Sequence, residues 1–180
     1  PTNPEMGFQL DPKSIEKAIN QKTRAILLNS PNNPTGAVYS SETLVKILEF
    51  CSAQQIWIIS DEVYSEIAPE GFIPFTSIPG SHEQTVTISS LSKSHRMTGW
   101  RCGWMVGPKN LTRHLTNLNI CMTYGIPPFI QDAAFKALEK EKDTAKLVKK
   151  RLDRNRVILR KELGSLENAK LFAQGGGMFA

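Results

Sequence analysis

The chain has 180 residues, of which 40% are hydrophobic and 22% are charged, and its formal net charge is +5. This length suits one domain with a sizeable core, and the composition is ordinary for a globular protein. No apolar run approaches the length that a membrane span needs, and the opening residues PTNPEMGF are unlike a signal peptide.

The first part of the chain alternates short apolar runs with helical patterns, which favours an α/β domain built on a largely parallel sheet. A helix is expected over residues 11–20, with Asp11 as its N-cap and Pro12 at the first helical position. The run RAILLNS, residues 24–30, predicts a strand that is buried on both faces.

A second helix is expected over residues 40–55, with Ser40 or Ser41 as its cap. Its apolar residues fall on one stripe at helical spacing: Leu44, Ile47, Leu48 and Cys51. Further strands are expected over residues 56–60, 85–89 and 99–107. Residues 65–84 show no clear pattern, and connections of this length are more often functional than structural.

The remainder of the chain is predicted to be mostly helical, with helices over residues 108–122, 127–142 and 143–163. In the middle helix a stripe is expected to face the core: Ile130, Ala133, Ala134, Ala137 and Leu138. Residues 169–173 predict a last strand. Together these elements predict a three-layer αβα fold in which helices flank a mostly parallel sheet.

Most of the positive charge lies in residues 146–161, where Val148, Leu152 and Leu159 share one side of a predicted helix and basic residues cover the rest. We expect a solvated helix face. Binding of nucleic acid is the lesser alternative, because no exposed aromatic residues alternate with the charges.

The three cysteines, Cys51, Cys102 and Cys121, have no metal-ligand spacing, and their odd number does not suggest a disulfide framework. We expect reduced, buried or half-buried thiols in a cytoplasmic protein, and no metal site.

Unusual polar sequences follow three of the predicted strands. RAILLNS runs into PNNPTG, IWIIS runs into DEVY, and TVTIS runs into SLSK. Ligands of an open parallel sheet bind just beyond the carboxyl ends of its strands, so these segments are expected to converge on one crevice. The side chains concerned are Asn33, Asp61, Tyr64, Ser90 and Lys93.

Each of these residues has an ordinary structural explanation when it is taken alone. PNNPTG can be a plain turn, Asp61 can cap a helical turn, and Tyr64 can be a core aromatic residue. Lys93 and Arg101 can be solvated. Their joint occurrence at strand ends of one α/β domain is much harder to explain in this way.

The segments NSPNNPTG, DEVY and SLSKSHRMTGWR match, in order and spacing, the signature segments of class I/II aminotransferases. The sequence therefore resembles these fold-type-I enzymes, which depend on pyridoxal 5′-phosphate (PLP). The resemblance covers the whole chain, and it implies that residues 1–174 are part of the large cofactor-binding domain and that residues 175–180 begin the connection to a smaller one. The stretch LTRHLTNLNICMTYGIPPFIQDAAFKALE looks similar to arginine–pyruvate aminotransferases.

The resemblance implies that Lys93 forms a Schiff base with the PLP aldehyde and later moves the proton of the substrate α-carbon. An amine can do either only when it is deprotonated. Asp61 would face the pyridine nitrogen and keep the ring protonated, so that the ring can accept the electrons left by the departing proton.

The resemblance also assigns two pairs of cofactor-binding residues. Asn33 and Tyr64 would hydrogen-bond the phenolic oxygen of the PLP ring. Ser90 and Arg101 would hold the phosphate, which a hydroxyl donor and a guanidinium fork suit well. A cis peptide bond is a hypothesis for Asn33–Pro34, since the family often has one at this turn.

The implied function is transfer of an amino group from an L-α-amino acid to a 2-oxo acid, possible substrates being arginine and pyruvate. The implied assembly is a homodimer, with Tyr124 in the TYGIPP break as a candidate crossing point between subunits. Because the chain begins without methionine and ends at GGGMFA, we expect an internal piece of a longer protein. Such a piece would bind PLP weakly and transaminate poorly, because the arginine that grips the substrate carboxylate would lie outside it.

Two positions depart from the family pattern. Arg96 stands where the family has a small or apolar residue, and we expect it to face solvent rather than to bind phosphate. Cys102 follows the phosphate arginine, where it is a modest hydrophobic exchange. His82, His95 and His114 are expected to be surface or hydrogen-bonded histidines.

Two alternatives remain open at the level of sequence. A C–S lyase or an aminocyclopropanecarboxylate synthase of the same fold would share Lys93, Asp61, Tyr64 and Arg101. A transcription regulator with an aminotransferase-like sensor domain would use the same residues to sense a ligand, and it would carry a DNA-binding domain upstream.

Overall fold

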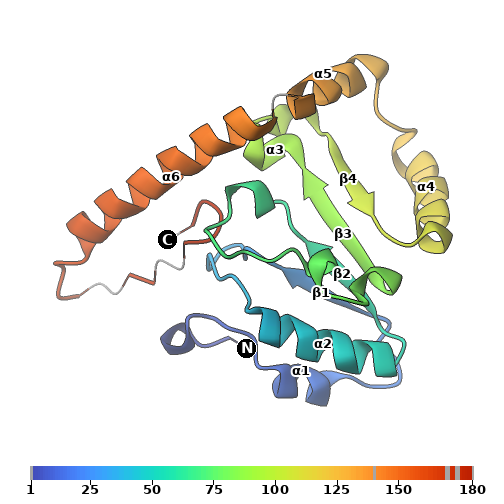
Figure 1. The fold of residues 1–180 in the computed structure, drawn as a ribbon, viewed down its shortest axis with the longest axis horizontal. Coiled ribbons are helices and arrows are strands. Elements are labelled where there is room, and N and C mark those ends of the chain that lie inside the picture. Colours follow the sequence, from blue (N-terminus) through green and yellow to red (C-terminus); the bar gives the residue numbers. More distant parts are fainter. Residues whose placement is uncertain (1, 140, 169–170, 173–174, 180) are drawn as a thin grey trace.

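The computed structural model describes residues 2–139, 141–168, 171–172 and 175–179 (Figure 1). Its sheet has the strand order β1 (Ala25–Asn29), β2 (Trp57–Asp61), β3 (Thr85–Ser90) and β4 (Gly103–Val106). The first three strands are parallel, and β4 runs antiparallel to β3. The prediction of an α/β fold with a mostly parallel sheet is therefore confirmed.

The α-helices are α1 (Pro12–Ala18), α2 (Ser41–Ala53), α3 (Leu91–Ser94), α4 (Lys109–Thr123), α5 (Pro128–Glu139) and α6 (Glu141–Leu163). The chain also forms short 3₁₀ turns, namely η1 (Pro4–Met6), η2 (Ser65–Ile67), η3 (Phe75–Ser77), η4 (Ser81–Glu83) and η5 (Thr98–Trp100). Helices α1 and α2 lie together along one side of the sheet, α4 and α5 lie beyond β4, and α6 extends away from the sheet (Figure 1).

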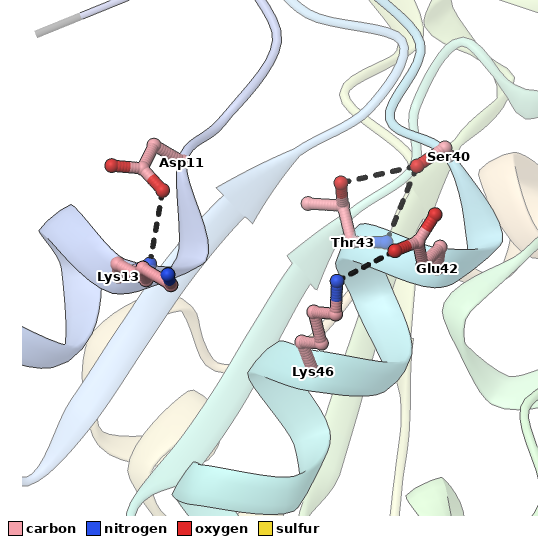
Figure 2. Close-up of polar contacts among 6 residues, drawn as sticks. All are labelled: Asp11, Lys13, Ser40, Glu42, Thr43 and Lys46. Carbon is pink, nitrogen blue, oxygen red and sulfur yellow. Dashed lines mark hydrogen bonds and ion pairs between the residues drawn. The ribbon is translucent and has the colours of Figure 1, made fainter.

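Helices α1 and α2 begin at the caps that the sequence predicts (Figure 2). The Asp11 carboxylate accepts hydrogen bonds from the backbone N–H groups of Lys13 and Ser14 at 3.1 and 3.2 Å. The Ser40 hydroxyl accepts one from the Thr43 N–H at 3.2 Å. These bonds satisfy amide groups that have no partner within the first turn of a helix.

The main core lies between α2 and the face of the sheet that carries Leu28 and Ile58. The predicted stripe of α2 is buried in it: Leu44, Ile47, Leu48 and Cys51. Leu27 points to the opposite face and is 67% exposed. The expectation that this strand is buried on both faces is therefore wrong, because β1 is at the edge of the sheet and α2 covers only the face of Leu28.

The C-terminal helices also differ from expectation. In α5 only Ala134 is buried, Ile130, Ala133 and Ala137 are half-buried, and Leu138 is 39% exposed. Most of α6 is exposed, as expected for a solvated helix, although Leu159 is exposed as well. The strand predicted over 169–173 falls mainly on residues 169, 170 and 173, which lie outside the described residues, and Leu171 and Phe172 are not in a strand.

The cysteines are free, as predicted, but Cys121 is exposed rather than buried or half-buried. Burial raises the pKa of the Cys51 thiol to about 11, which keeps it protonated and unreactive at neutral pH. In the part of the chain that the structure describes, no helix is long and apolar enough to cross a membrane.

The long connection 65–84, which shows no regular pattern in the sequence, packs against the core. It folds into η2, η3 and η4, and it buries Phe75 and Ile78 in the main cluster. Glu62 anchors it, because its Oε1 accepts hydrogen bonds from the Phe75 N–H and the Ser60 hydroxyl, both at 2.8 Å. This carboxyl is 4% exposed.

The burial of Glu62 makes the stability of the protein depend on pH. Burial raises the pKa of this carboxyl above its ordinary value of 4.5, the two hydrogen bonds oppose the rise, and the charge of Asp61 adds to it. The folded state therefore keeps a proton that the unfolded state has released, so stability falls as the pH rises from 4.5 through the folded pKa. Replacing Glu62 with glutamine removes this titration.

We expect the unfolding free energy of the wild type, minus that of Glu62→Gln, to decrease over this pH range and then to level off. Urea denaturation of the full-length proteins at a series of pH values from about 4 to 8 measures the difference. The matched control is Glu70→Gln, at an exposed position of the same connection. A difference between wild type and Glu62→Gln that is flat with pH would contradict the expectation.

Candidate active site

The carboxyl ends of β1, β2 and β3 lie side by side. Asn29 pairs with Asp61, and Asp61 pairs with Ile88, in the register of the parallel ladder. The polar segments that follow these strands therefore start from one edge of the sheet, as the sequence predicts. Mostly parallel α/β domains bind their ligands beyond this edge.

Asn29 joins two of these segments, and sequence reasoning missed it. Its side-chain amide donates to the Asp61 carbonyl at 3.1 Å, and its side-chain oxygen accepts from the Asn33 N–H at 2.7 Å. The only signal in the sequence is a polar residue at the end of an otherwise apolar strand. Asn33–Pro34 is cis, as hypothesised, and Ser30–Pro31 is also cis.

Tyr64 is 3% exposed and lies at the centre of the site. Its ring meets the ring of Phe179 edge-on, with centroids 5.4 Å apart. Burial raises the pKa of the Tyr64 phenol above its ordinary value of 10.0, the charge of Asp61 also raises it, and a hydrogen bond with the Asn33 side chain lowers it. The phenol is therefore protonated at neutral pH and can donate a hydrogen bond.

Lys93 is carried by α3, one residue before its end. Ser90 is the N-cap of this helix, and its hydroxyl accepts from the Ser92 N–H at 3.0 Å. The Lys93 Nζ lies 5.7 Å from the centroid of the Tyr64 ring, within the range of a cation–π contact. The structure thus brings the amine of Lys93, which follows β3, close to the ring of Tyr64, which follows β2.

Ser90 and Arg101 line a cavity of about 660 Å³ between β3, β4 and α4. The Ser90 hydroxyl donates to the Cys102 carbonyl at 3.0 Å. Arg101 has a left-handed backbone, with φ of 51°, and one Nη donates to the Thr98 carbonyl at 3.0 Å. Thr112, Thr116 and Asn119 of α4 also contribute polar groups to the lining.

The predicted site residues thus fall into two neighbouring groups. Asn33, Asp61, Tyr64 and Lys93 form one group, and they are not part of the cavity lining. Ser90 and Arg101 belong to the cavity. The groups meet at the turn after β2, where Val63 lines the cavity and its N–H donates to the Asp61 carboxylate at 3.3 Å.

The residues that depart from the family pattern lie beside the site. Arg96 is exposed, as expected, and has a φ of 57°. Cys102 is 8% exposed and packs with Leu91 and Ala134, which fits a hydrophobic exchange.

The histidines were expected to be at the surface or hydrogen-bonded, and His95 meets this expectation at one ring nitrogen only. His82 and His114 are exposed. His95 is 8% exposed, and its Nδ1 lies 2.8 Å from the Ser94 hydroxyl. Its Nε2 has no hydrogen-bond partner among the described residues, so it is only half satisfied.

The arrangement defines an α/β domain that gathers an amine, a phenol and a carboxylate at the ends of parallel strands. The family model described as aminotransferase class I and II matches residues 1–180. The chain belongs to this family.

Two relatives among the curated proteins illustrate the match. Arginine–pyruvate transaminase AruH of Pseudomonas aeruginosa is 43% identical over 180 residues, which are 99% of this chain and 46% of that protein. Kynurenine–oxoglutarate transaminase 1 of Homo sapiens is 35% identical over 145 residues, 77% of this chain and 34% of that protein. The chain thus spans less than half the length of these relatives.

Solved structures agree. The aromatic aminotransferase from Pyrococcus horikoshii has a TM-score of 0.89 at 32% identity, covering 98% of this chain and 48% of that chain. A double mutant of Thermus thermophilus aspartate aminotransferase has a TM-score of 0.86 at 32% identity, covering 91% and 44%. The fold is thus that of the fold-type-I aminotransferases.

Proposed function

We propose that the protein is a PLP-dependent aminotransferase that transfers an amino group from an L-α-amino acid to a 2-oxo acid, with Lys93 as its catalytic amine. The observation that carries the proposal is the meeting of Lys93 with Tyr64 at the strand ends of a chain of this family. Because the chain is shorter than its relatives, the proposal concerns the full-length protein.

The residues of the site fit PLP in their chemistry. The amine of Lys93 suits the aldehyde, and the Asp61 carboxylate suits a protonated pyridine nitrogen. The Tyr64 phenol is held by Asn33 and can donate to the ring oxygen. Ser90 and Arg101, on the cavity wall, suit the phosphate. When it is bound, PLP supplies an electron sink for the α-carbon of the substrate.

The protein's own groups would then orient the substrate and move its protons. Lys93 would attach the cofactor, be displaced by the substrate amine, and as a free amine take the α-proton. Its Nζ lies beside the Tyr64 ring, which is itself buried. Tyr64 and Asn33 would keep the ring plane fixed, so that the α-proton is presented to Lys93.

The proposed substrates are arginine as amino donor and pyruvate as acceptor. The support is the 43% identity, over nearly all of this chain, to a protein named arginine–pyruvate transaminase. Relatives at 35–38% identity carry names with other substrates, so the donor is the finer part of the proposal.

The proposed assembly is a homodimer. Large apolar side chains are exposed on α4 and α5, and a second subunit could cover them: Leu118, Ile120, Met122, Phe129 and Phe135. Tyr124, between these helices, is 92% exposed. This exposure supports the hypothesis that the break between α4 and α5 contacts the partner.

The test is an absorption and turnover experiment on the full-length protein mixed with PLP. We expect a visible absorption band that survives dialysis. After reduction with borohydride, the cofactor should stay covalently attached to the protein. We also expect arginine and pyruvate to yield 2-oxo acid and alanine in equal amounts, with no ammonia. Ammonia or a cyclised product would indicate a lyase or synthase instead. A bound cofactor without any turnover of amino acids would favour a sensor and overturn the proposal.

A further inference from the structure

The glycine segment, residues 175–179, lies against the turn that carries Asn33. The Gly176 N–H donates to the Gly36 carbonyl at 2.9 Å. A Cβ on Gly176 would overlap that carbonyl oxygen and lie 2.8 Å from the Cβ of Pro31. Only glycine therefore allows the two backbones to approach so closely.

The same segment also lies against Tyr64. A Cβ on Gly177, whose φ is 59°, would lie 3.3 Å from two atoms of the Tyr64 ring. Phe179 meets this ring edge-on. The glycine segment therefore bounds the position that the phenol can take beside Lys93.

Arg156 of α6 holds the glycine segment in place. One Nη of Arg156 donates to the Gly177 carbonyl, and the other donates to the Asp153 carboxylate at 2.7 Å. The second oxygen of that carboxylate accepts from Lys149 at 2.9 Å. Arg156 is 6% exposed, which is unusual for a guanidinium. Both of its Nη atoms are hydrogen-bonded, whereas its buried Nε has no partner among the described residues.

Helix α6 also packs against two elements that contain or directly follow the reactive groups. It contacts α3, which contains Lys93, and η2, which follows Tyr64 directly. In Figure 1 the red loop of residues 175–179 lies below α6, near the turn after β2. Arg156 thus connects α6 to Tyr64 through the glycine segment. It binds the carbonyl of Gly177, and Gly177 and Phe179 of this segment lie against the Tyr64 ring.

We propose that Arg156 is a positioning residue that fixes Tyr64 beside Lys93 by holding the carbonyl of Gly177. This inference rests on the proposed function, because it assigns a role to Tyr64 in the site. It predicts that loss of the Arg156 fork frees the glycine segment, opens the Tyr64 ring to water and disorders the phenol relative to the amine.

The test measures the phenol of Tyr64 directly, in the cofactor-free full-length protein. Tyrosine labelled with ¹³C in the ring is titrated by NMR, and the Tyr64 signal is assigned by its loss in Tyr64→Phe. In Arg156→Met we expect the Tyr64 pKa to fall toward its ordinary value of 10.0, because burial is the main cause that raises it. We also expect kcat of the holoenzyme to fall about tenfold, with a smaller change in KM.

Three further variants make the result specific. Arg154→Met, at an exposed position of α6, should leave the Tyr64 titration unchanged. Arg156→Lys keeps the charge but not the two-armed fork, so an intermediate shift is expected. Gly176→Ala displaces the glycine segment from its other contact and should shift the same titration while Arg156 is intact.

The two proposals fail separately. An unchanged Tyr64 titration in folded Arg156→Met and in Gly176→Ala overturns the positioning role, whatever the activity. If Arg156→Met does not fold, Arg156→Lys and Gly176→Ala decide. A wild type without transamination overturns the proposed function, and the titration still decides whether Arg156 sets Tyr64.

Discussion

Replacement of Lys93 with alanine is expected to lower kcat for amino-group transfer by about 10⁴-fold, the upper range for loss of a group that acts in proton transfer. The side chain would both attach the cofactor and take the α-proton, so two steps lose their reagent. Alanine also removes the cation from beside the Tyr64 ring. Steady-state turnover with arginine and pyruvate measures the loss, and borohydride trapping measures the attachment.

A second substitution separates attachment from charge. Lys93→Arg keeps a cation near Tyr64 but cannot lose its proton at neutral pH, so the same loss of kcat is expected. A small amine added to the solution should restore part of the activity of Lys93→Ala, because it can enter the space left by the lysine side chain. It should restore none of the activity of Lys93→Arg, in which that space is filled. Lys22→Ala, on an exposed turn, is the control. Substantial turnover by Lys93→Ala without added amine would contradict the role of this lysine.

Local sequence signals predict the elements on one side of the sheet well. Asp11 and Ser40 cap their helices because each side chain needs only the backbone that follows it. The stripe on α2 is buried because its spacing matches one helix face. The position of the polar residues is also predictable. They come directly after apolar runs, and parallel strands end at one edge of the sheet.

The predictions that were wrong concern burial, which depends on what packs over an element. Local sequence patterns carry no information about that packing. Leu27 and Leu138 are as apolar as their buried neighbours, but no described element packs closely over them. The stretch 65–84 lacks periodicity, yet it is fixed by tertiary contacts of Phe75, Ile78 and Glu62. Periodicity reports the regular part of a chain and is silent about irregular segments that pack.

The site shows the same division. Motif spacing indicates the groups that would react, but the groups that orient them come from elsewhere in the chain. Asn29 acts through bonds to two other segments, and Arg156 lies in a helix whose charges suggest only a solvated face. Their roles depend on distances between segments far apart in sequence, and a single sequence does not contain these distances.

Replacement of Asp61 with asparagine is expected to lower kcat by about 10²–10³-fold, the usual loss when one charged or hydrogen-bonding group that stabilises a transition state is removed. The amide cannot keep a pyridine nitrogen protonated, so the ring would accept electrons less well. The fold should persist, because the Asp61 carbonyl still accepts from Ser30 and Asn29 and an asparagine oxygen can still accept from Val63.

The same substitution has an independent readout in the cofactor-free protein. The negative charge of Asp61 raises the pKa of the Tyr64 phenol, so Asp61→Asn should lower that pKa. Asp132→Asn, at an exposed position of α5, serves as the control for both measurements. If turnover falls while the Tyr64 titration is unchanged, the carboxylate does not act on the phenol across the site. If neither changes, Asp61 is only a turn residue and the strand-end chemistry must be assigned elsewhere.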